Sequence, residues 1–242
     1  MLLKMDEYTD FKFWEKYWKN LKIGQGKGIF FEKLITDFPG NARLIEVGGF
    51  PGRLVAYFKK VKNYDVTILD YYIDPAIINK VEEANELPSG SINFIKGDFL
   101  NMDLKEEYDI VCSFGFLEHF NDTKEIIERH LKLLKKGGTL LITIPNFKGI
   151  NGWFQKKFHF ENYARHNLKC MDITILNLII RQLNLKTFQI GYFGTPGVWF
   201  EDDVKVNKII HFIADNINRV IKRIPFRANF FLAPDIYIKA IK

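Results

Sequence analysis

The feature that most constrains the fold is a regular alternation of short apolar runs and longer amphipathic runs between residues 42 and 146. The short runs are rich in β-branched residues and are expected to be strands, at 42–47, 65–69, 91–96, 108–113 and 139–144. The amphipathic runs predict helices at 53–60, 74–85 and 123–134. Strands that alternate with helices form βαβ units, which build a mostly parallel sheet. The sequence therefore predicts an α/β fold.

Two further runs with strand composition, 186–193 and 235–241, follow the alternating region. We expect them to close the sheet as a hairpin-like pair, which makes seven strands with the last one antiparallel. Amphipathic segments at 172–183 and 204–224 predict helices in the same part of the chain. The expected architecture is a doubly wound, mostly parallel seven-stranded sheet with helices on both faces and a cap inserted after the fifth strand.

Positive charge is concentrated in the second half of the chain. The formal net charge of +6 divides into −4 over residues 1–121 (15 basic, 19 acidic) and +10 over residues 122–242 (20 basic, 10 acidic). Such a field attracts an anionic substrate or surface, and an ordinary solvated surface rich in lysine is the alternative. No aromatic RNA-binding strand motif accompanies the basic residues, so nucleic acid is not the expected partner.

The composition favours a cytoplasmic protein. The longest apolar runs are only a few residues, far below the roughly 20 that cross a bilayer, and residues 1–10 lack a secretory apolar region. Cys112 and Cys170 are the only cysteines, too few for a disulfide framework. No metal-ligand pattern is identified in the sequence, and no bound metal is expected.

A glycine-rich turn follows the first expected strand. The acidic Glu46 lies near the end of that strand, and Gly48, Gly49 and Gly52 precede the next helix. Glycines let the backbone approach a ligand closely, and the helix N-terminus offers N–H groups to a carboxylate. On its own, such a turn is equally typical of a tight connection from a strand to a helix.

The residues of this turn do not fit a dinucleotide site. The G-x-G-x-x-G pattern that holds a pyrophosphate fails at Phe50 and Arg53, and the carboxylate of Glu46 would repel the phosphates. A carboxylate at this place instead suits a ligand with a cationic end. A nicotinamide-dependent oxidoreductase is therefore a disfavoured alternative.

Two more acidic residues come directly after strands. Asp70 ends the second strand, 24 positions after Glu46, close to the offset of roughly 20 at which an acid binds ribose hydroxyls. Asp98 follows the third strand and can accept from an adenine amine, while Phe99 offers a stacking face. Each acid alone is more often a helix cap or a solvated loop charge. Because ligands in open α/β sheets bind beyond the carboxyl ends of the strands, the three acids together predict one site.

In their order and spacing, these segments resemble the motifs of class I methyltransferases, particularly the small-molecule type 11 group. The residues that carry the resemblance are Glu46 to Gly52, Leu69-Asp70, Gly97-Asp98-Phe99, Tyr108 to Ser113 with Leu117-Glu118-His119, and Leu134 to Leu140. They cover under half of the chain. The resemblance implies a Rossmann-like domain that binds S-adenosylmethionine. Phe50 departs from the family pattern, which usually has a small residue at this place.

The resemblance also implies which residues bind the cofactor. The methionine part would lie on the glycine-rich turn, the ribose on Asp70, and the adenine on Asp98 and Phe99. Ser113 and Phe114 would face the sulfonium. The complete cofactor-binding set that we expect is Glu46, Gly48, Gly49, Gly52, Asp70, Tyr71, Asp98, Phe99, Ser113 and Phe114.

Catalysis by such an enzyme consists chiefly of aligning the acceptor and excluding water, since the sulfonium is already an excellent leaving group. A histidine can remove a proton from an oxygen or amine acceptor near neutral pH, and His119 lies nearest the cofactor motifs. A capping or structural role for His119 is an equal alternative. The aromatic, basic insertion after the fifth strand is expected to bind the acceptor, or else simply to pack under a loop. The substrate-binding residues expected in it are Trp153, His159, Tyr163, Arg165 and His166.

We expect one methyltransferase domain over residues 1–242. Its parts would be an N-terminal helical cover (1–40), a cofactor-binding core (41–146), a substrate cap (147–170) and a helical insertion (204–226). The expected reaction is O-methylation of a small polar or anionic acceptor, such as a sugar or a phosphate-bearing precursor of a cell-surface polysaccharide. A non-catalytic cofactor-binding module is the second alternative. The segment 204–224 is basic and carries a stripe of apolar residues, so peripheral contact with an anionic membrane is a further alternative. The sequence does not predict the oligomeric state.

Overall fold

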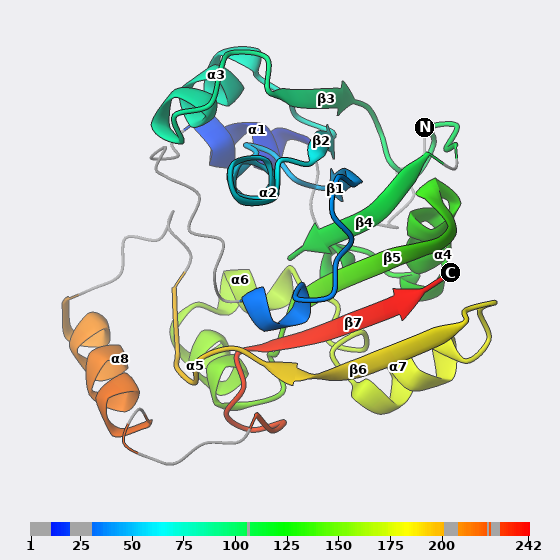
Figure 1. Ribbon diagram of the computed structural model, residues 1–242. Coiled ribbons are helices and arrows are strands. Elements are labelled where there is room, and N and C mark those ends of the chain that lie inside the picture. Colours follow the sequence, from blue (N-terminus) through cyan, green and yellow to red (C-terminus); the bar gives the residue numbers. More distant parts are fainter. Residues whose placement is uncertain (1–10, 20–30, 106, 201–207, 222, 224–227) are drawn as a thin grey trace, which may run out of the picture.

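The computed structural model describes residues 11–19, 31–105, 107–200, 208–221, 223 and 228–242 (Figure 1). The strands are β1 (Arg43–Val47), β2 (Asp65–Asp70), β3 (Ile92–Lys96), β4 (Tyr108–Phe114), β5 (Leu134–Pro145), β6 (Thr187–Phe193) and β7 (Asp235–Ile241). The helices are α1 (Phe11–Lys19), α2 (Arg53–Lys62), α3 (Pro75–Ala84), α4 (Thr123–Leu133), α5 (Ile150–Phe158), α6 (Phe160–Ala164), α7 (Ile173–Ile180) and α8 (Lys208–Ile221). Two short 3₁₀ helices are η1 (Glu32–Leu34) and η2 (Leu117–His119).

The strands form one seven-stranded sheet in the order β3-β2-β1-β4-β5-β7-β6. From β3 to β5 neighbouring strands are parallel, and β7 is antiparallel to both β5 and β6. The strand order reverses at β1, which lies between β2 and β4. The architecture expected from the sequence is thus confirmed, including the antiparallel last strand.

Both faces of the sheet are covered by helices. In β1, Ile45 and Val47 belong to a core cluster that includes Ile126 of α4, whereas Leu44 belongs to a cluster that includes Val55 of α2. Alternate residues of a strand point to opposite faces, which explains this division. A sheet that is buried on both faces has strands that are nearly continuous apolar runs. This is why the strands could be recognised from their composition.

The ends of most elements follow local signals in the sequence. Side-chain oxygens of Asp74, Asp122 and Asp172 accept backbone N–H groups at the starts of α3, α4 and α7, as N-caps do. The strand β5 differs from expectation because it begins at Leu134 instead of residue 139. Leu134 already pairs with Tyr108 before a shift of register in the ladder. The basic and glycine residues that follow are therefore part of an irregular strand.

The structure describes the expected cap completely, but only parts of the expected N-terminal cover and helical insertion. Of the expected N-terminal cover, residues 1–10 and 20–30 lie outside the described residues, and α1 and η1 are helical. The expected cap 147–170 contains α5 and α6. Of the insertion 204–226, residues 204–207, 222 and 224–226 lie outside the described residues, and α8 forms the helix.

Candidate active site

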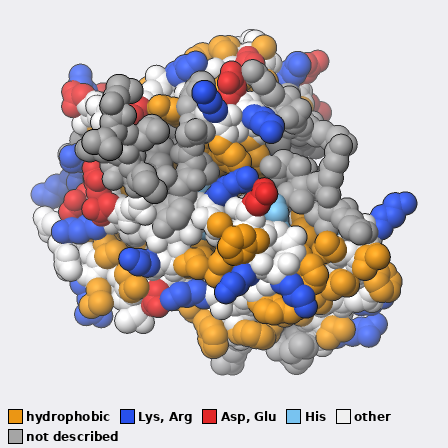
Figure 2. All heavy atoms as spheres, turned by 180° about the vertical axis from the view of Figure 1, so that it is seen from behind, with side chains coloured by type: hydrophobic (Ala, Val, Ile, Leu, Met, Phe, Trp, Pro, Cys, Tyr) orange, Lys and Arg blue, Asp and Glu red, His pale blue; other side chains and the backbone are white. Residues whose placement is uncertain are grey.

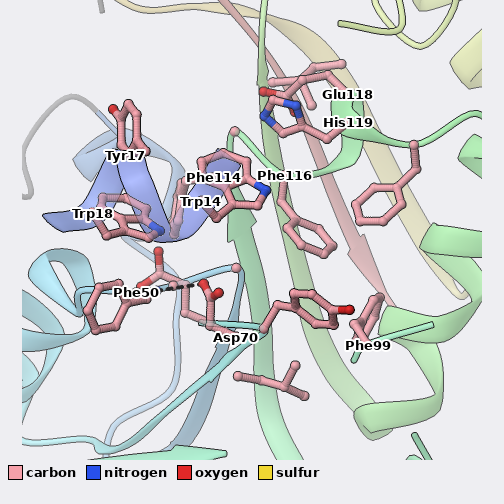
Figure 3. Close-up of a pocket in the computed structure, with 18 of the residues that line it drawn as sticks. Trp14, Tyr17, Trp18, Phe50, Asp70, Phe99, Phe114, Phe116, Glu118 and His119 are labelled. Atoms are coloured by element: carbon pink, nitrogen blue, oxygen red, sulfur yellow. Dashed lines mark hydrogen bonds between the residues drawn. The ribbon is translucent and has the colours of Figure 1, made fainter. Parts of the chain in front are cut away.

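A cavity of about 420 Å³ lies at the carboxyl ends of the parallel strands. Residues from β1, β2, β4 and β5 line it, together with residues of α1 and α6. The cavity therefore lies where the strand order reverses, which is where open α/β sheets bind their ligands. Figure 3 shows Asp70 and Phe50 toward one end, and Glu118 and His119 toward the other.

Two carboxylates converge at the first end of the cavity. Glu46 of β1 is 4% exposed, and Asp70 ends the neighbouring strand β2. Burial and the negative charge of Asp70 raise the pKa of Glu46 to about 8. Burial also raises the pKa of Asp70 to about 6, although its oxygens accept hydrogen bonds from Phe50 N (3.1 Å) and Tyr72 N (3.0 Å). Two neighbouring carboxyl groups with raised pKa values indicate a binding site for a cation or for hydroxyl donors.

The glycine-rich turn brings the backbone up to the cavity wall. Gly48 has a φ of 69°, in the left-handed region, and a Cβ there would overlap the ring of Phe116. A Cβ at Gly49 would lie 2.8 Å from Cγ of Glu46. Both positions line the cavity, so the close approach expected from the sequence depends on glycine here.

Arg53, the first residue of α2, also lines this end of the cavity. Its Nε is buried and has no hydrogen-bond partner within the part of the chain that the structure describes. A buried donor in this condition indicates a missing ligand. A guanidinium beside a helix N-terminus suits a carboxylate. The sequence analysis used Arg53 only as a departure from the dinucleotide pattern and missed it as a site residue.

Asp98, Phe99 and Tyr71 line the cavity beside the first end. The carboxylate of Asp98 accepts a hydrogen bond from Leu100 N (2.9 Å) within its own loop. The ring of Phe99 meets that of Phe116 edge-on, with centroids 5.6 Å apart. This part of the cavity thus combines an aromatic wall with a carboxylate, as a purine base requires.

The helix α1 spans the cavity from one end to the other. Trp18 packs against Phe50, with ring centroids 5.5 Å apart, and Trp14 packs against His119 at 5.2 Å. Figure 3 shows this helix with its aromatic side chains above the cavity. The N-terminal helix therefore covers the site.

The second end of the cavity holds a carboxylate and two imidazoles. The donor atoms of Glu118, His119 and His166 all lie within 4.8 Å of one another. Burial, with a contribution from His166, lowers the pKa of His119 to about 3, and burial lowers the pKa of His166 to about 4. Both imidazoles are therefore neutral near pH 7.

Arg165 and Asp235 also line the cavity. The guanidinium of Arg165 lies over the ring of Phe13, 4.5 Å from its centroid, and its Nη2 is 3.7 Å from Oε2 of Glu161. Burial raises the pKa of Asp235, the first residue of β7, to about 7. Asp235 could not be predicted as a site residue, because an acid at the start of a distant strand carries no local signal. Glu118 belongs to a motif that carries the family resemblance, but no role was predicted for it.

Two residues of the expected cofactor-binding set do not line the cavity. Gly52 supports the turn from behind, since its φ is 97° and a Cβ would lie 2.8 Å from Cδ1 of Ile68. Ser113 is fully buried beside Phe114, which does line the cavity. A cofactor contact by Ser113 stays a prediction.

Three of the five residues expected to bind the acceptor also lie elsewhere. Trp153 and Tyr163 line a separate depression beside Phe230, and His159 joins α5 to α6. Arg165 and His166, which follow α6, do line the cavity.

The helix α8 carries exposed apolar side chains. Ile209, Phe212 and Val220 are 65%, 68% and 60% exposed. Figure 2 shows hydrophobic side chains mixed with Lys and Arg over the lower half of the rear face. No helix among the described residues is long and apolar enough to span a bilayer. Peripheral membrane contact by this segment stays a prediction.

Comparison with known proteins settles the family. The family model for a methyltransferase domain matches residues 23–190. The chain belongs to this methyltransferase family. A sterol 24-C-methyltransferase of Neurospora crassa is 25% identical over 166 residues, 66% of this chain and 40% of that protein. A malonyl-[acyl-carrier protein] O-methyltransferase of Ilyobacter polytropus is 24% identical over 158 residues, 65% of this chain and 45% of that protein. This methyltransferase thus matches less than half the length of either relative.

Solved structures share the fold of this methyltransferase. A SAM-dependent methyltransferase of Archaeoglobus fulgidus superposes with a TM-score of 0.58 and 20% identity, covering 96% of this chain and all of that one. Phosphoethanolamine N-methyltransferase 2 of Haemonchus contortus, solved with S-adenosylmethionine, gives a TM-score of 0.62 at 15% identity, covering 97% and 57%. The Rossmann-like fold, the class I methyltransferase resemblance and S-adenosylmethionine as the cofactor are confirmed. The oxidoreductase alternative is accordingly discarded.

The cavity residues fit this cofactor. Its amino-acid end carries an ammonium and a carboxylate, and the first end of the cavity offers a buried acceptor and a buried donor. These atoms, Glu46 Oε2 and Arg53 Nε, both lack hydrogen-bond partners among the described residues. Asp70 would hold the ribose hydroxyls, and Asp98 with Phe99 the adenine. The separation of charge in the site thus matches the separation of charge in the ligand.

Proposed function

We propose that the domain transfers the methyl group of S-adenosylmethionine to an oxygen of a small, anionic acceptor. The observation that carries the proposal is one cavity with acids for the cofactor at one end and Arg165 with two imidazoles at the other. A sugar or a phosphate-bearing precursor of a cell-surface polysaccharide has the required hydroxyl and charge. The Haemonchus contortus relative is named for an acceptor that also carries phosphate.

The cofactor, when bound, supplies an electrophilic methyl group on a sulfonium leaving group. The task of the chain is then to align the acceptor and to exclude water. Trp14 and Trp18 of α1 cover the cavity, and Phe114 and Phe116 form part of its wall. Arg165 would bind the anionic group of the acceptor and so direct its hydroxyl toward the cofactor.

A hydroxyl acceptor loses its proton as the oxygen–carbon bond forms, and two groups can receive it. His119, with a pKa of about 3, is a weak base, whereas Asp235, with a pKa of about 7, matches the working range. We assign the proton to Asp235. A fall in kcat for Asp235→Asn larger than that for His119→Gln, at equal cofactor affinity, supports this assignment. If His119→Gln lowers kcat more than Asp235→Asn does, His119 is the group that receives the proton.

The acceptor class is tested by release of S-adenosylhomocysteine with paired substrates, each a sugar and its phosphate ester. We expect turnover of the phosphate ester, and we expect Arg165→Gln to raise its KM about tenfold or more, the scale of a lost charged hydrogen bond. Lys157→Gln is the matched control, because Lys157 lies over the Trp153 ring outside the cavity. Equal KM values for the ester in wild type and Arg165→Gln would contradict the anionic acceptor. No release with any hydroxyl acceptor would favour the non-catalytic module.

Cofactor affinity is expected to rise between pH 6 and pH 8. The ammonium of the cofactor binds the ionised form of Glu46, whose pKa is about 8, next to Asp70, whose pKa is about 6. Calorimetry should show a gain of up to about tenfold per pH unit in this window, and Glu46→Gln should flatten it. Without cofactor, Glu46 binds a proton in the native state that it releases in the unfolded chain, so its own contribution to the free energy of unfolding should fall as pH rises. A cofactor affinity that does not change with pH would contradict the contact between Glu46 and the ammonium.

A further inference from the structure

The residues Glu118, His119 and His166 form a compact group of possible metal ligands at the second end of the cavity. One atom from each can be chosen so that all three lie within 4.8 Å of one another. Figure 3 shows Glu118 directly beside the ring of His119. We propose that these three side chains bind one divalent first-row transition-metal ion.

The backbone fixes the two segments that carry these side chains. Glu118 and His119 lie on η2, and His166 follows α6. Asn167 joins the segments, since its backbone N–H donates to Glu118 O (2.7 Å) and its side-chain Nδ2 donates to Phe120 O (2.8 Å). The three side chains are therefore held together by structure that does not depend on the ion.

The hydrogen bonds of the two imidazoles leave one nitrogen of each ring for a ligand. His166 Nδ1 lies 2.7 Å from Asn162 O, so it carries the proton and Nε2 carries a lone pair. His119 bonds to the backbone of Arg165, and its Nδ1 is buried without a hydrogen-bond partner among the described residues. Metal-binding histidines typically donate their other N–H to a carbonyl in this way.

Two imidazoles and one carboxylate suit zinc, iron, manganese or cobalt rather than magnesium or calcium. Ligand atoms lie about 2.0–2.2 Å from such an ion, so neighbouring ligand atoms around a tetrahedral ion are about 3.4 Å apart. The three donor atoms lie within 4.8 Å of one another, so the side chains must move together by up to about 1.4 Å to bind an ion. Glu118 is 1% exposed, so its carboxylate lies largely out of contact with water. The cavity leaves the remaining coordination positions open.

The role of the ion rests on the proposed function. A divalent cation at this place would bind the hydroxyl oxygen of the acceptor and lower its pKa. The proton would then pass to Asp235 or to water, while the oxygen forms its bond to the methyl carbon and the carbon–sulfur bond breaks. From the sequence no bound metal was expected, because His166 is distant from Glu118 along the chain and no ligand spacing connects them.

Titration of the chelator-treated chain with Co²⁺ tests the proposal, because bound Co²⁺ absorbs visible light according to its ligands. We expect one equivalent to saturate the visible bands. We expect Glu118→Gln and His166→Gln each to weaken Co²⁺ binding at least tenfold. His211→Gln is the matched control, since His211 is exposed on α8 and contacts Phe200 instead of the cavity. It should bind Co²⁺ like wild type.

Binding of S-adenosylhomocysteine, measured on the same samples, shows whether each variant keeps its fold. Glu118→Gln and His166→Gln should retain this binding, because the cofactor end of the cavity is unchanged. No saturable Co²⁺ band in wild type, or wild-type affinity in folded His166→Gln, would overturn the metal site. Failure of the wild-type chain to bind S-adenosylhomocysteine would instead overturn the proposed function, and the Co²⁺ titration would still decide the metal site.

Discussion

Asp70→Ala is expected to weaken binding of S-adenosylmethionine by about 1–3 kcal/mol, roughly a 5- to 150-fold rise in Kd. The carboxylate at the end of β2 would accept the ribose hydroxyls, and it already accepts the backbone N–H groups of Phe50 and Tyr72. Alanine therefore removes a ligand contact and two bonds that shape the wall of the site. Calorimetry with the cofactor measures the change directly.

Asp65→Ala is the matched control for this loss. Asp65 begins the same strand at the opposite end, where it is exposed and lies 3.5 Å from the guanidinium of Arg43. Its removal should leave cofactor affinity unchanged, because an exposed ion pair contributes little even to stability. Asp70→Asn keeps the side-chain shape and separates loss of charge from loss of loop order. Wild-type affinity in both Asp70 variants would remove this residue from the cofactor site.

The cofactor half of the fold could be predicted from the sequence because its constraints are local. The central strands β1 and β4 are almost entirely buried, and the starts of α3 and α4 carry the capping aspartates Asp74 and Asp122. Gly48 and Gly49 stand at positions where any side chain would collide with Phe116 or Glu46. Strand ends that lie far apart in the sequence still meet at one sheet edge. The convergence of Glu46 and Asp70 in one cavity follows from this rule alone.

The acceptor half was harder to predict because its geometry is set by packing between distant segments. The aromatic composition of 147–170 was visible, but the direction of Trp153 and Tyr163 depends on how α5 and α6 lie on the sheet. Nothing local in the sequence connects Glu118 with His166, or brings Asp235 to the cavity.

Gly152→Ala is expected to lower the free energy of unfolding by about 2–3 kcal/mol, as overpacking in a buried site does. Gly152 lies on α5, is buried, and a Cβ there would overlap the backbone of Phe147. A backbone neighbour cannot rotate away, so α5 must shift, and the cap residues that it supports must shift with it. For a chain of this size the loss corresponds to a fall in Tm of about 4–12 °C, measurable by calorimetry.

The effect should be confined to the cap. No residue of α5 lines the cavity, so S-adenosylhomocysteine should still bind Gly152→Ala while the KM for the acceptor rises. Gly40→Ala is the control, because no atom lies within 4 Å of the added Cβ, and the substitution should leave Tm unchanged or slightly higher. A wild-type Tm in Gly152→Ala would mean that α5 moves freely against Phe147. In that case the cap could not hold Arg165 and His166 in fixed positions, and the proposal that Arg165 binds the anionic group of the acceptor would be contradicted.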